Sequence, residues 1–182
     1  MPKQLNDEYV TRAALKAQSL AKWDERFMEI AFTVAEWSSC FQENRQVGAV
    51  IARDKRIVTT GYNGAGSGII SCKERCSCMR REKNIESGTR QEYCYAVHAE
   101  QNAVIQAAKI GVPIDGATIY CTHRPCVICA KIIINSGIKR VVYCEDYPDD
   151  FAVKLFKEAE VELHKYNGPK PQLSKLPVRK GK

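Results

Sequence analysis

Hydrophobic positions near the start of the chain follow a helical spacing. In residues 24–39 they recur near the 3.6-residue period of an amphipathic helix, and residues 8–22 read as a separate helix before it. We expect the break between the two at Trp23-Asp24, with Asp24 as the N-cap of the second helix.

Short apolar runs follow, and they are typical of strands rather than helices. Residues 47–52 form a continuous apolar run that predicts a buried strand. Asp54-Lys55 predicts a turn, and residues 56–62 the returning strand of a hairpin. The glycine-rich residues 63–68 predict a loop.

Strand and helix patterns alternate in the rest of the chain. In order, we expect a helix over 98–110, a strand over 117–121, a helix over 126–136, a strand over 140–144, a helix over 149–158 and a strand over 161–164. A hairpin followed by such alternation predicts an α/β fold, a three-layer α/β/α sandwich with a mixed sheet of about five strands. Functional sites of these sheets lie at the carboxyl ends of the parallel strands, where helices begin.

One segment interrupts this order. Residues 69–97 show no clear hydrophobic period but contain four cysteines, which indicates an insert that has a function or needs a cross-link to hold its structure. We therefore divide the chain into an N-terminal helical extension over 1–22, one domain over 23–166 that carries the insert, and a basic tail over 167–182 with little expected order.

Composition narrows the possibilities. A chain of 182 residues with 45% hydrophobic content suits one globular domain. Its apolar runs are too short to span a bilayer, and the first residues lack a signal core, so we expect a cytoplasmic protein without a membrane partner. Nine cysteines, an odd number, favour metal ligation over disulfides in such a compartment.

The net charge of +7 is partly concentrated near the C-terminus. The cations there are Lys165, Lys170, Lys175, Arg179, Lys180 and Lys182. One interpretation is a solvated tail, and the other is attraction of nucleotide phosphates or nucleic acid.

The strongest chemical signal is a pair of short motifs. His98-Ala99-Glu100 precedes Pro-Cys-x-x-Cys, which holds Cys126 and Cys129, and this combination is the signature of zinc deaminases. His98, Cys126 and Cys129 can bind Zn²⁺ and leave a fourth position open, while Glu100 transfers protons without binding the metal. The competing interpretation is a closed structural zinc site with a fourth protein ligand.

From about residue 23 to 165 the chain resembles the deoxycytidylate (dCMP) deaminase family, in its bacterial and phage branch with a cysteine-bearing insert. The stretches that carry the resemblance are the two motifs above, Val47 to Ile51, Thr60 to Ala65, Ser67-Gly68, Gly116 to Tyr120, Thr122 and Ser136 to Arg140. Gly66 stands where the family usually has proline.

The resemblance implies zinc-dependent hydrolysis of dCMP to dUMP and ammonia, which supplies the thymidylate precursor. It also implies a homo-oligomer, commonly a hexamer, and regulation by dCTP and dTTP with Mg²⁺ accompanying the effector. The implied effector-binding residues are Gly61, Tyr62, Asn63 and Gly64. Asn63 is also implied to contact the substrate sugar, and the Ala99 backbone the pyrimidine carbonyl.

The remaining cysteines suggest a second metal site. Cys40, Cys72, Cys78 and Cys94 can form a tetrahedral structural zinc site that would fix the insert. Cys76 competes with Cys78 as a ligand, and free thiols are the alternative for the whole set.

Other candidates are weaker. Cys121 and Cys144 lie in predicted strands and are expected in the core. Arg124, close to Cys126, is the best placed residue for the substrate phosphate, with Arg45 and Lys109 as further candidates, although an exposed surface role is the alternative for each.

Other functions share the same metal motifs. They are deamination of another cytosine nucleotide, deamination of tRNA adenosine, and a non-catalytic zinc-stabilised module that binds nucleic acid. The loop from Gly61 to Gly68 and the cysteine-rich insert argue against the tRNA enzyme, and Glu100 argues against the non-catalytic module. We therefore expect a small nucleotide, rather than nucleic acid, as the partner.

Overall fold

Five strands form one mixed sheet in the computed structural model, which describes residues 3–86 and 88–171. Their order is β2 (Arg56–Tyr62), β1 (Gly48–Arg53), β5 (Thr118–His123), β6 (Arg140–Glu145) and β7 (Glu162–Lys165). β1 pairs antiparallel with both neighbours, whereas β5, β6 and β7 run parallel. The predicted mixed sheet is confirmed.

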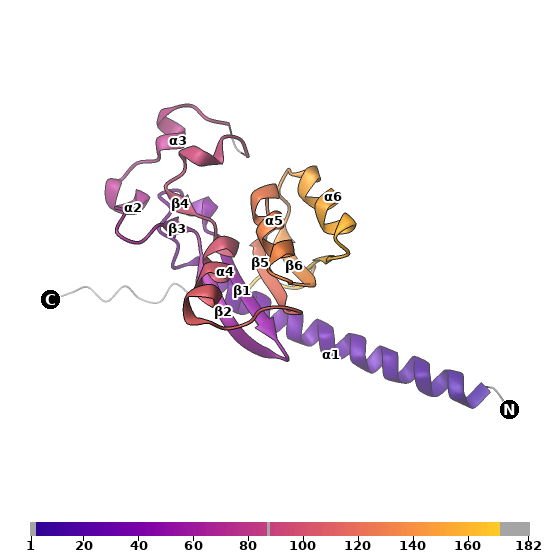
Figure 1. Ribbon diagram of the computed structural model, residues 1–182. Helices are drawn as coiled ribbons and strands as arrows, with labels where there is room; N and C mark the ends of the chain where they lie inside the picture. The colour runs from indigo at the N-terminus through magenta and orange to yellow at the C-terminus, as the bar shows by residue number, and fades with distance from the viewer. Residues whose placement is uncertain (1–2, 87, 172–182) are drawn as a thin grey trace.

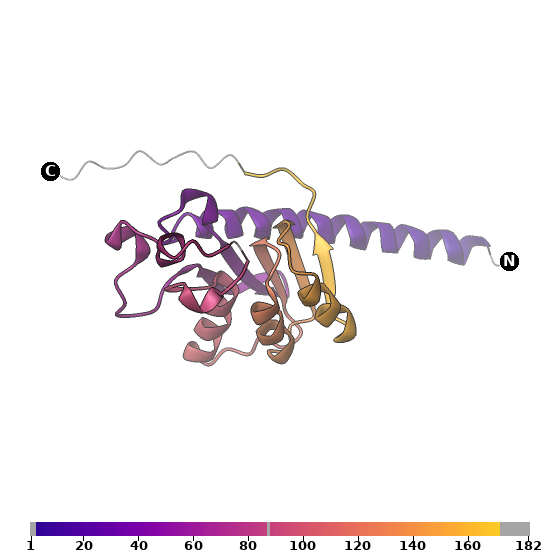
Figure 2. The same ribbon diagram turned by 90° about the horizontal axis from the view of Figure 1, so that it is seen from above.

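Helices cover both faces of this sheet. The helix α1 (Lys3–Ala35) packs on one face, and α4 (Ala99–Ile110), α5 (Val127–Asn135) and α6 (Asp150–Glu158) pack on the other (Figure 1, Figure 2). Each face has its own apolar cluster, one built around α4 to α6 and one around α1. The three-layer sandwich is therefore confirmed.

The predicted break at Trp23-Asp24 is wrong, because α1 is continuous from Lys3 to Ala35. Asp24 is not an N-cap but a buried ion-pair partner. Its two carboxylate oxygens accept hydrogen bonds of 2.7 and 2.8 Å from Arg140, and one also accepts from the Tyr120 hydroxyl. The partners lie 116 residues apart, so local sequence gave no sign of the pair.

The insert contains only short elements. These are α2 (Cys72–Arg75), α3 (Met79–Glu82) and a 3-10 turn over Gln91–Tyr93; another such turn, Glu43–Arg45, precedes β1. The segment over 63–68 is not entirely a loop, because β3 (Gly64–Ala65) pairs with β4 (Ala96–Val97). This pairing joins the segment just before the insert to the end of the insert, directly before His98.

Other sequence predictions can be placed. Cys121 and Cys144 are buried, as expected. Lys165 and Lys170 form ion pairs with Asp146 and Glu145, and the tail over 172–182 lies outside the described residues. No helix in the described ranges is long and apolar enough to cross a membrane.

Candidate metal centre and active site

The structure brings the three expected metal ligands together at the starts of two helices. His98 is the N-cap of α4, Cys126 is the N-cap of α5, and Cys129 lies in the first turn of α5. His98 Nδ1 is 3.3 Å from Cys129 Sγ and 3.5 Å from Cys126 Sγ. Within the described ranges, these residues form the only group of at least three His, Cys, Asp or Glu whose ligand atoms lie within 4.8 Å of one another.

This arrangement fits Zn²⁺. Tetrahedral zinc with ordinary Zn–N and Zn–S bonds places its nitrogen and sulfur ligands about 3.6 Å apart, close to the distances found. Hydrogen bonding from Cys129 lowers the pKa of the Cys126 thiol to about 4, so the thiolate that a metal requires is favoured. With three protein ligands, His98, Cys126 and Cys129 would leave a fourth position for a reacting molecule.

Glu100 lies beside this group in the first turn of α4 and is only 5% exposed. Burial raises the pKa of its carboxyl, while the neighbouring His98 opposes that shift. A buried carboxyl with a raised pKa can both accept and return a proton near neutral pH.

Two capping interactions fix the helix starts that carry these residues. The backbone N–H of His98 donates to Gln101 Oε1 at 2.9 Å. Asp149 accepts from the backbone N–H of Val127 at 2.7 Å and from that of Ala152 at 3.0 Å, so one carboxylate caps both α5 and α6. Sequence analysis missed this double role, although Asp149 did precede a predicted helix.

Gly61 brings α4 close to the sheet. It lies in β2, and a Cβ at this position would be 2.2 Å from the Ala99 carbonyl oxygen and 2.4 Å from the Ala103 nitrogen. Its absent side chain therefore sets the position of the helix that carries Glu100. Of the other expected effector residues, Tyr62 is partly exposed and packs edge-to-face on Trp37.

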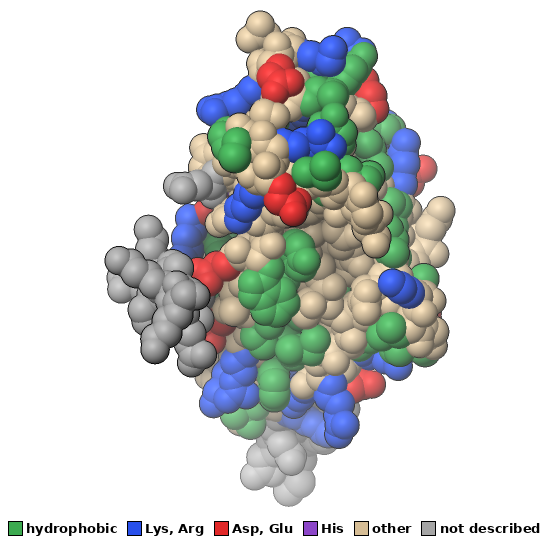
Figure 3. Space-filling view, turned by 90° about the vertical axis from the view of Figure 1, so that its left-hand side faces the viewer, with side chains coloured by type: hydrophobic (Ala, Val, Ile, Leu, Met, Phe, Trp, Pro, Cys, Tyr) green, Lys and Arg blue, Asp and Glu red, His purple; other side chains and the backbone are tan. Residues whose placement is uncertain are grey.

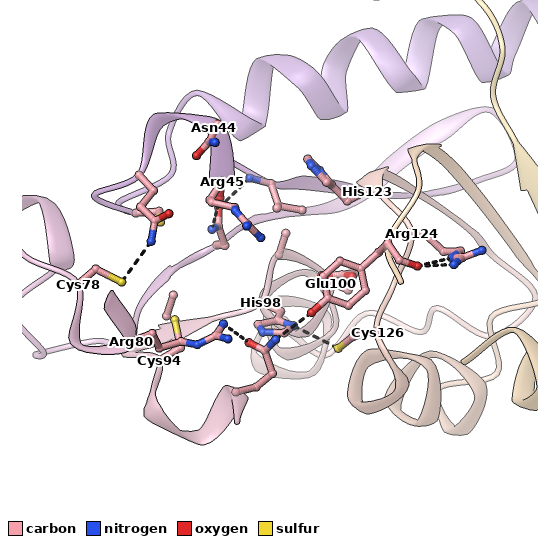
Figure 4. Close-up of a pocket in the computed structure, with 18 of the residues that line it drawn as sticks. Asn44, Arg45, Cys78, Arg80, Cys94, His98, Glu100, His123, Arg124 and Cys126 are labelled. Atoms are coloured by element: carbon pink, nitrogen blue, oxygen red, sulfur yellow. Dashed lines mark hydrogen bonds between the residues drawn. The ribbon is translucent and has the colours of Figure 1, made fainter. Parts of the chain in front are cut away.

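A cavity of about 670 Å³ opens above the metal ligands (Figure 4). Asn63, Ala99 and Glu100 line it, together with Arg45 and Arg124. The Asn63 side chain accepts from the Val47 N–H and donates to the Arg45 carbonyl oxygen, both at 2.8 Å, so it also braces the cavity wall.

Arg124 does not point into the cavity as expected (Figure 4). Its Nε donates to the Tyr147 carbonyl oxygen at 3.0 Å, its Nη2 donates to the same oxygen, and its Nη1 lies 3.9 Å from Asp146. Lys109 lies in the last turn of α4, outside the residues that line the cavity.

Among the cavity residues that the sequence analysis missed are Arg80, Gln91 and Tyr147. Gln91 connects the other two, because its side chain accepts from Arg80 Nη1 at 3.1 Å and donates to the Tyr147 hydroxyl at 2.9 Å. Arg80 and Gln91 belong to the insert, so these bonds tie it to the segment after β6. The cationic Arg80-Arg81 pair between the cysteines was the available signal.

The thiols expected at a second metal site lie farther apart than the catalytic ligands: no three of Cys40, Cys72, Cys78 and Cys94, all of them described residues, have sulfur atoms within 4.8 Å of one another. Burial raises the pKa of the Cys40 thiol, and Cys94 and Cys78 add to the effect. Burial likewise raises the pKa of the Cys72 thiol, and Cys94, Cys40 and Cys78 contribute to the rise. Cys76 is exposed and its thiol lies 3.5 Å from the Lys73 carbonyl oxygen.

Comparisons with known proteins agree with this geometry. Residues 21–145 match the model of the cytidine and deoxycytidylate deaminase zinc-binding region. The chain is 41% identical over 143 residues to ComE operon protein 2 of Bacillus subtilis, which covers 78% of this chain and 69% of that protein. It is 42% identical over 127 residues to the deoxycytidylate deaminase of Mycobacterium phage D29, which covers 66% and 93% respectively.

A solved structure adds a match in three dimensions. The dCMP deaminase of cyanophage S-TIM5, crystallised with dCMP and dUMP, superposes with a TM-score of 0.64 at 30% identity and covers 78% of this chain and 94% of its own. The matched residues 21–145 include the segments that carry His98, Glu100 and the cysteine pair. This chain therefore belongs to the cytidine and deoxycytidylate deaminase family.

Proposed function

We propose that this chain hydrolyses dCMP to dUMP and ammonia. The observation that carries the proposal is the His98, Cys126 and Cys129 group with the buried Glu100 beside it, in the lining of a cavity of about 670 Å³. Relatives named deoxycytidylate deaminase, and the cyanophage enzyme crystallised with dCMP and dUMP, support this choice of substrate.

The reaction adds water to C4 of the cytosine ring, breaks the C4–N bond and releases ammonia. When bound by His98, Cys126 and Cys129, Zn²⁺ supplies the Lewis acid that makes water nucleophilic at neutral pH. Glu100 takes one proton from the water and delivers it to N3 of the ring; it then takes the proton of the hydroxyl group added at C4, which becomes the carbonyl, and gives that proton to the leaving amino group. Its burial suits this work, because a carboxyl kept from bulk water exchanges protons with the substrate rather than with solvent.

Two further contacts orient the nucleotide. The Ala99 N–H, at the first position of α4, can donate to the pyrimidine carbonyl, since helix N-terminal N–H groups have no partner within the helix. Asn63 retains one amide hydrogen and one lone pair beyond its two backbone bonds, so it can still contact the sugar.

The test is ammonia release by the purified protein with dCMP, CMP, deoxycytidine, dCTP and an adenosine-containing RNA. We expect dCMP to have the highest kcat/KM of these substrates. Faster turnover of the RNA, or of another cytosine nucleotide, would replace dCMP with that substrate. Ammonia release from none of them by zinc-loaded protein would contradict deaminase activity.

We also propose a second, structural Zn²⁺ held by Cys40, Cys72, Cys78 and Cys94. The mutual effects among these thiols support the set, as does the Gln42 amide that donates to Cys78 Sγ at 3.4 Å. The exposed position of Cys76 favours Cys78 over it. The sulfur atoms would have to move closer together than they now lie, so metal binding would tighten the insert.

Regulation by dCTP and dTTP, with Mg²⁺ accompanying the effector, is a further proposal. The pairing of β3 with β4 supports it, because Gly64 is opposite Val97, the residue before His98. An effector bound at Tyr62 to Gly64 would therefore act on a strand that leads directly to a metal ligand. Gly66, in place of proline, makes the loop more costly to order, so we expect weak coupling.

Assembly into a homo-oligomer, such as a hexamer, is proposed as well. Figure 3 shows hydrophobic side chains gathered on one face of the molecule. Exposed apolar residues from neighbouring segments support such a surface, and they are Trp37, Phe41, Tyr62, Ile69 and Ile70. We also propose a cytoplasmic location, because none of the nine cysteines, all of which are described, forms a disulfide, and unpaired cysteines persist in a reducing compartment.

A further inference from the structure

Arg80 is a fixed cation in the wall of the active-site cavity. It lies in α3 of the insert, and its guanidinium donates to three neutral oxygens: Gln91 Oε1 at 3.1 Å, the Glu86 carbonyl at 2.7 Å and the Thr89 carbonyl at 2.6 Å. These bonds hold the guanidinium in one orientation without neutralising its charge.

Two features of Arg80 remain unexplained by the protein alone. Its Nε is buried and has no hydrogen-bond partner among the residues that the structure describes. Nor does any carboxylate in the described ranges form an ion pair with it. A partly buried charge without a counter-charge is costly, and a buried donor without an acceptor is rare, so both features point to an anion as the missing partner.

The surroundings of Arg80 place this positive charge at the reaction site. Burial raises the pKa of the Tyr147 phenol, and the charges of Arg80 and Arg45 both oppose the rise, so both cations lie within electrostatic range of Tyr147. Arg45 lines the same cavity (Figure 4). Arg124, by contrast, donates to the Tyr147 carbonyl oxygen and lies near the Asp146 carboxylate.

We propose that Arg80, assisted by Arg45, binds the 5′-phosphate of the substrate and so makes the site selective for nucleoside monophosphates over nucleosides. This inference rests on the proposed function, because it assigns one end of the same substrate. A phosphate monoester carries a charge of about −1.5 to −2 at neutral pH and offers strong acceptor oxygens that match a guanidinium. The insert would thus supply the phosphate contact, while the helix starts supply the chemistry.

The experiment compares dCMP with deoxycytidine, which differs only by the phosphate, in wild type, Arg80→Gln and Arg80→Lys. We expect Arg80→Gln to lower kcat/KM for dCMP on the order of 10- to 100-fold, the value of a charge-assisted hydrogen bond, mainly through KM. Turnover of deoxycytidine should stay within about twofold, and Arg80→Lys should recover part of the loss for dCMP.

Arg90→Gln is the matched control. It removes the same charge from the same insert, but Arg90 is exposed, pairs with Glu92 and does not line the cavity. It should leave the ratio of dCMP to deoxycytidine turnover unchanged.

Arg80 also holds two carbonyl groups of the insert, so a purely structural role must be distinguished. If its role were purely structural, Arg80→Gln would lower turnover of dCMP and of deoxycytidine alike. That result would overturn the proposal, as would any other result that leaves the ratio of dCMP to deoxycytidine turnover unchanged. Calorimetric titration with dCMP gives a second measurement, in a Glu100→Gln background that does not consume it. If the wild type deaminates neither substrate, the proposed function fails, but the titration still tests the phosphate contact. At least tenfold weaker binding of dCMP after Arg80→Gln would support that contact, and equal binding would overturn it.

Discussion

The catalytic metal centre and the cysteine-rich insert both gather cysteines, but the fold holds them in different ways. His98, Cys126 and Cys129 stand at helix starts packed on the sheet, with ligand atoms 3.3 and 3.5 Å apart. The insert has helices of only four residues, and Cys72 is its one fully buried cysteine. A site at strand–helix junctions is thus shaped by the core, whereas we propose that the insert needs a ligand of its own to become rigid.

The largest change in turnover should come from Glu100→Gln, which alters the catalytic centre and leaves the insert intact. The substitution keeps the size of the side chain but removes its ability to transfer protons, so turnover of dCMP should fall by about 10²- to 10⁴-fold. Bound zinc, measured by metal analysis, should stay at the wild-type level because Glu100 is not a ligand. Glu92→Gln, an exposed substitution in the insert, is the control, and near-normal turnover by the Glu100 variant would remove its assigned role.

Loss of the core ion pair should have the next largest effect. Asp24→Ala leaves Arg140 buried without its bidentate partner, which typically costs about 3–5 kcal/mol in free energy of unfolding. Urea denaturation would measure the loss. Glu92→Ala breaks an exposed ion pair in the insert and should leave the free energy of unfolding essentially unchanged. Equal losses in the two variants would show that the buried pair contributes no more to stability than the exposed one.

A smaller effect is expected where the sheet contacts the catalytic helix. Gly61→Ala places a methyl group against the backbone of α4, and such overpacking costs about 1–3 kcal/mol of stability. Since the helix carries Glu100, turnover should fall too. Gly66→Ala is the control, because its Cβ would meet only Ile69 Cδ1 at 3.5 Å. If both variants behaved like wild type in denaturation and in turnover, the close contact at Gly61 would not position the helix.

The smallest effect on turnover should come from the insert thiols. Wild type should contain about two zinc ions per chain, one for each proposed site. Cys72→Ser should lower this to about one and reduce thermal stability, whereas Cys76→Ser should change neither. A wild-type content of one zinc in protein purified without chelator would contradict the structural site.

The sequence predicted what depends on local spacing. Metal ligation requires a few residue types at fixed separations, and the alternation of apolar runs indicated the sheet, so both could be read from neighbouring residues. Contacts between distant segments could not be read in this way. The continuity of α1 was missed because nothing near Asp24 showed that this residue pairs with the distant Arg140 instead of capping a helix. Likewise, nothing near Arg124 showed that its side chain turns to the Tyr147 carbonyl oxygen. Arg80 lies in a segment without a period, so only the folded insert shows that it faces the cavity.

The contrast between a catalytic centre shaped by the fold and an insert that we propose is shaped by metal is tested most directly by hydrogen exchange before and after removal of zinc with a chelator. We predict that amides over residues 72–94 lose protection when the metal is removed, while those of α4, α5 and the central strands keep most of theirs. Loss of protection in α4 and α5 equal to that in the insert would contradict the claim that the core, rather than the metal, sets the catalytic geometry.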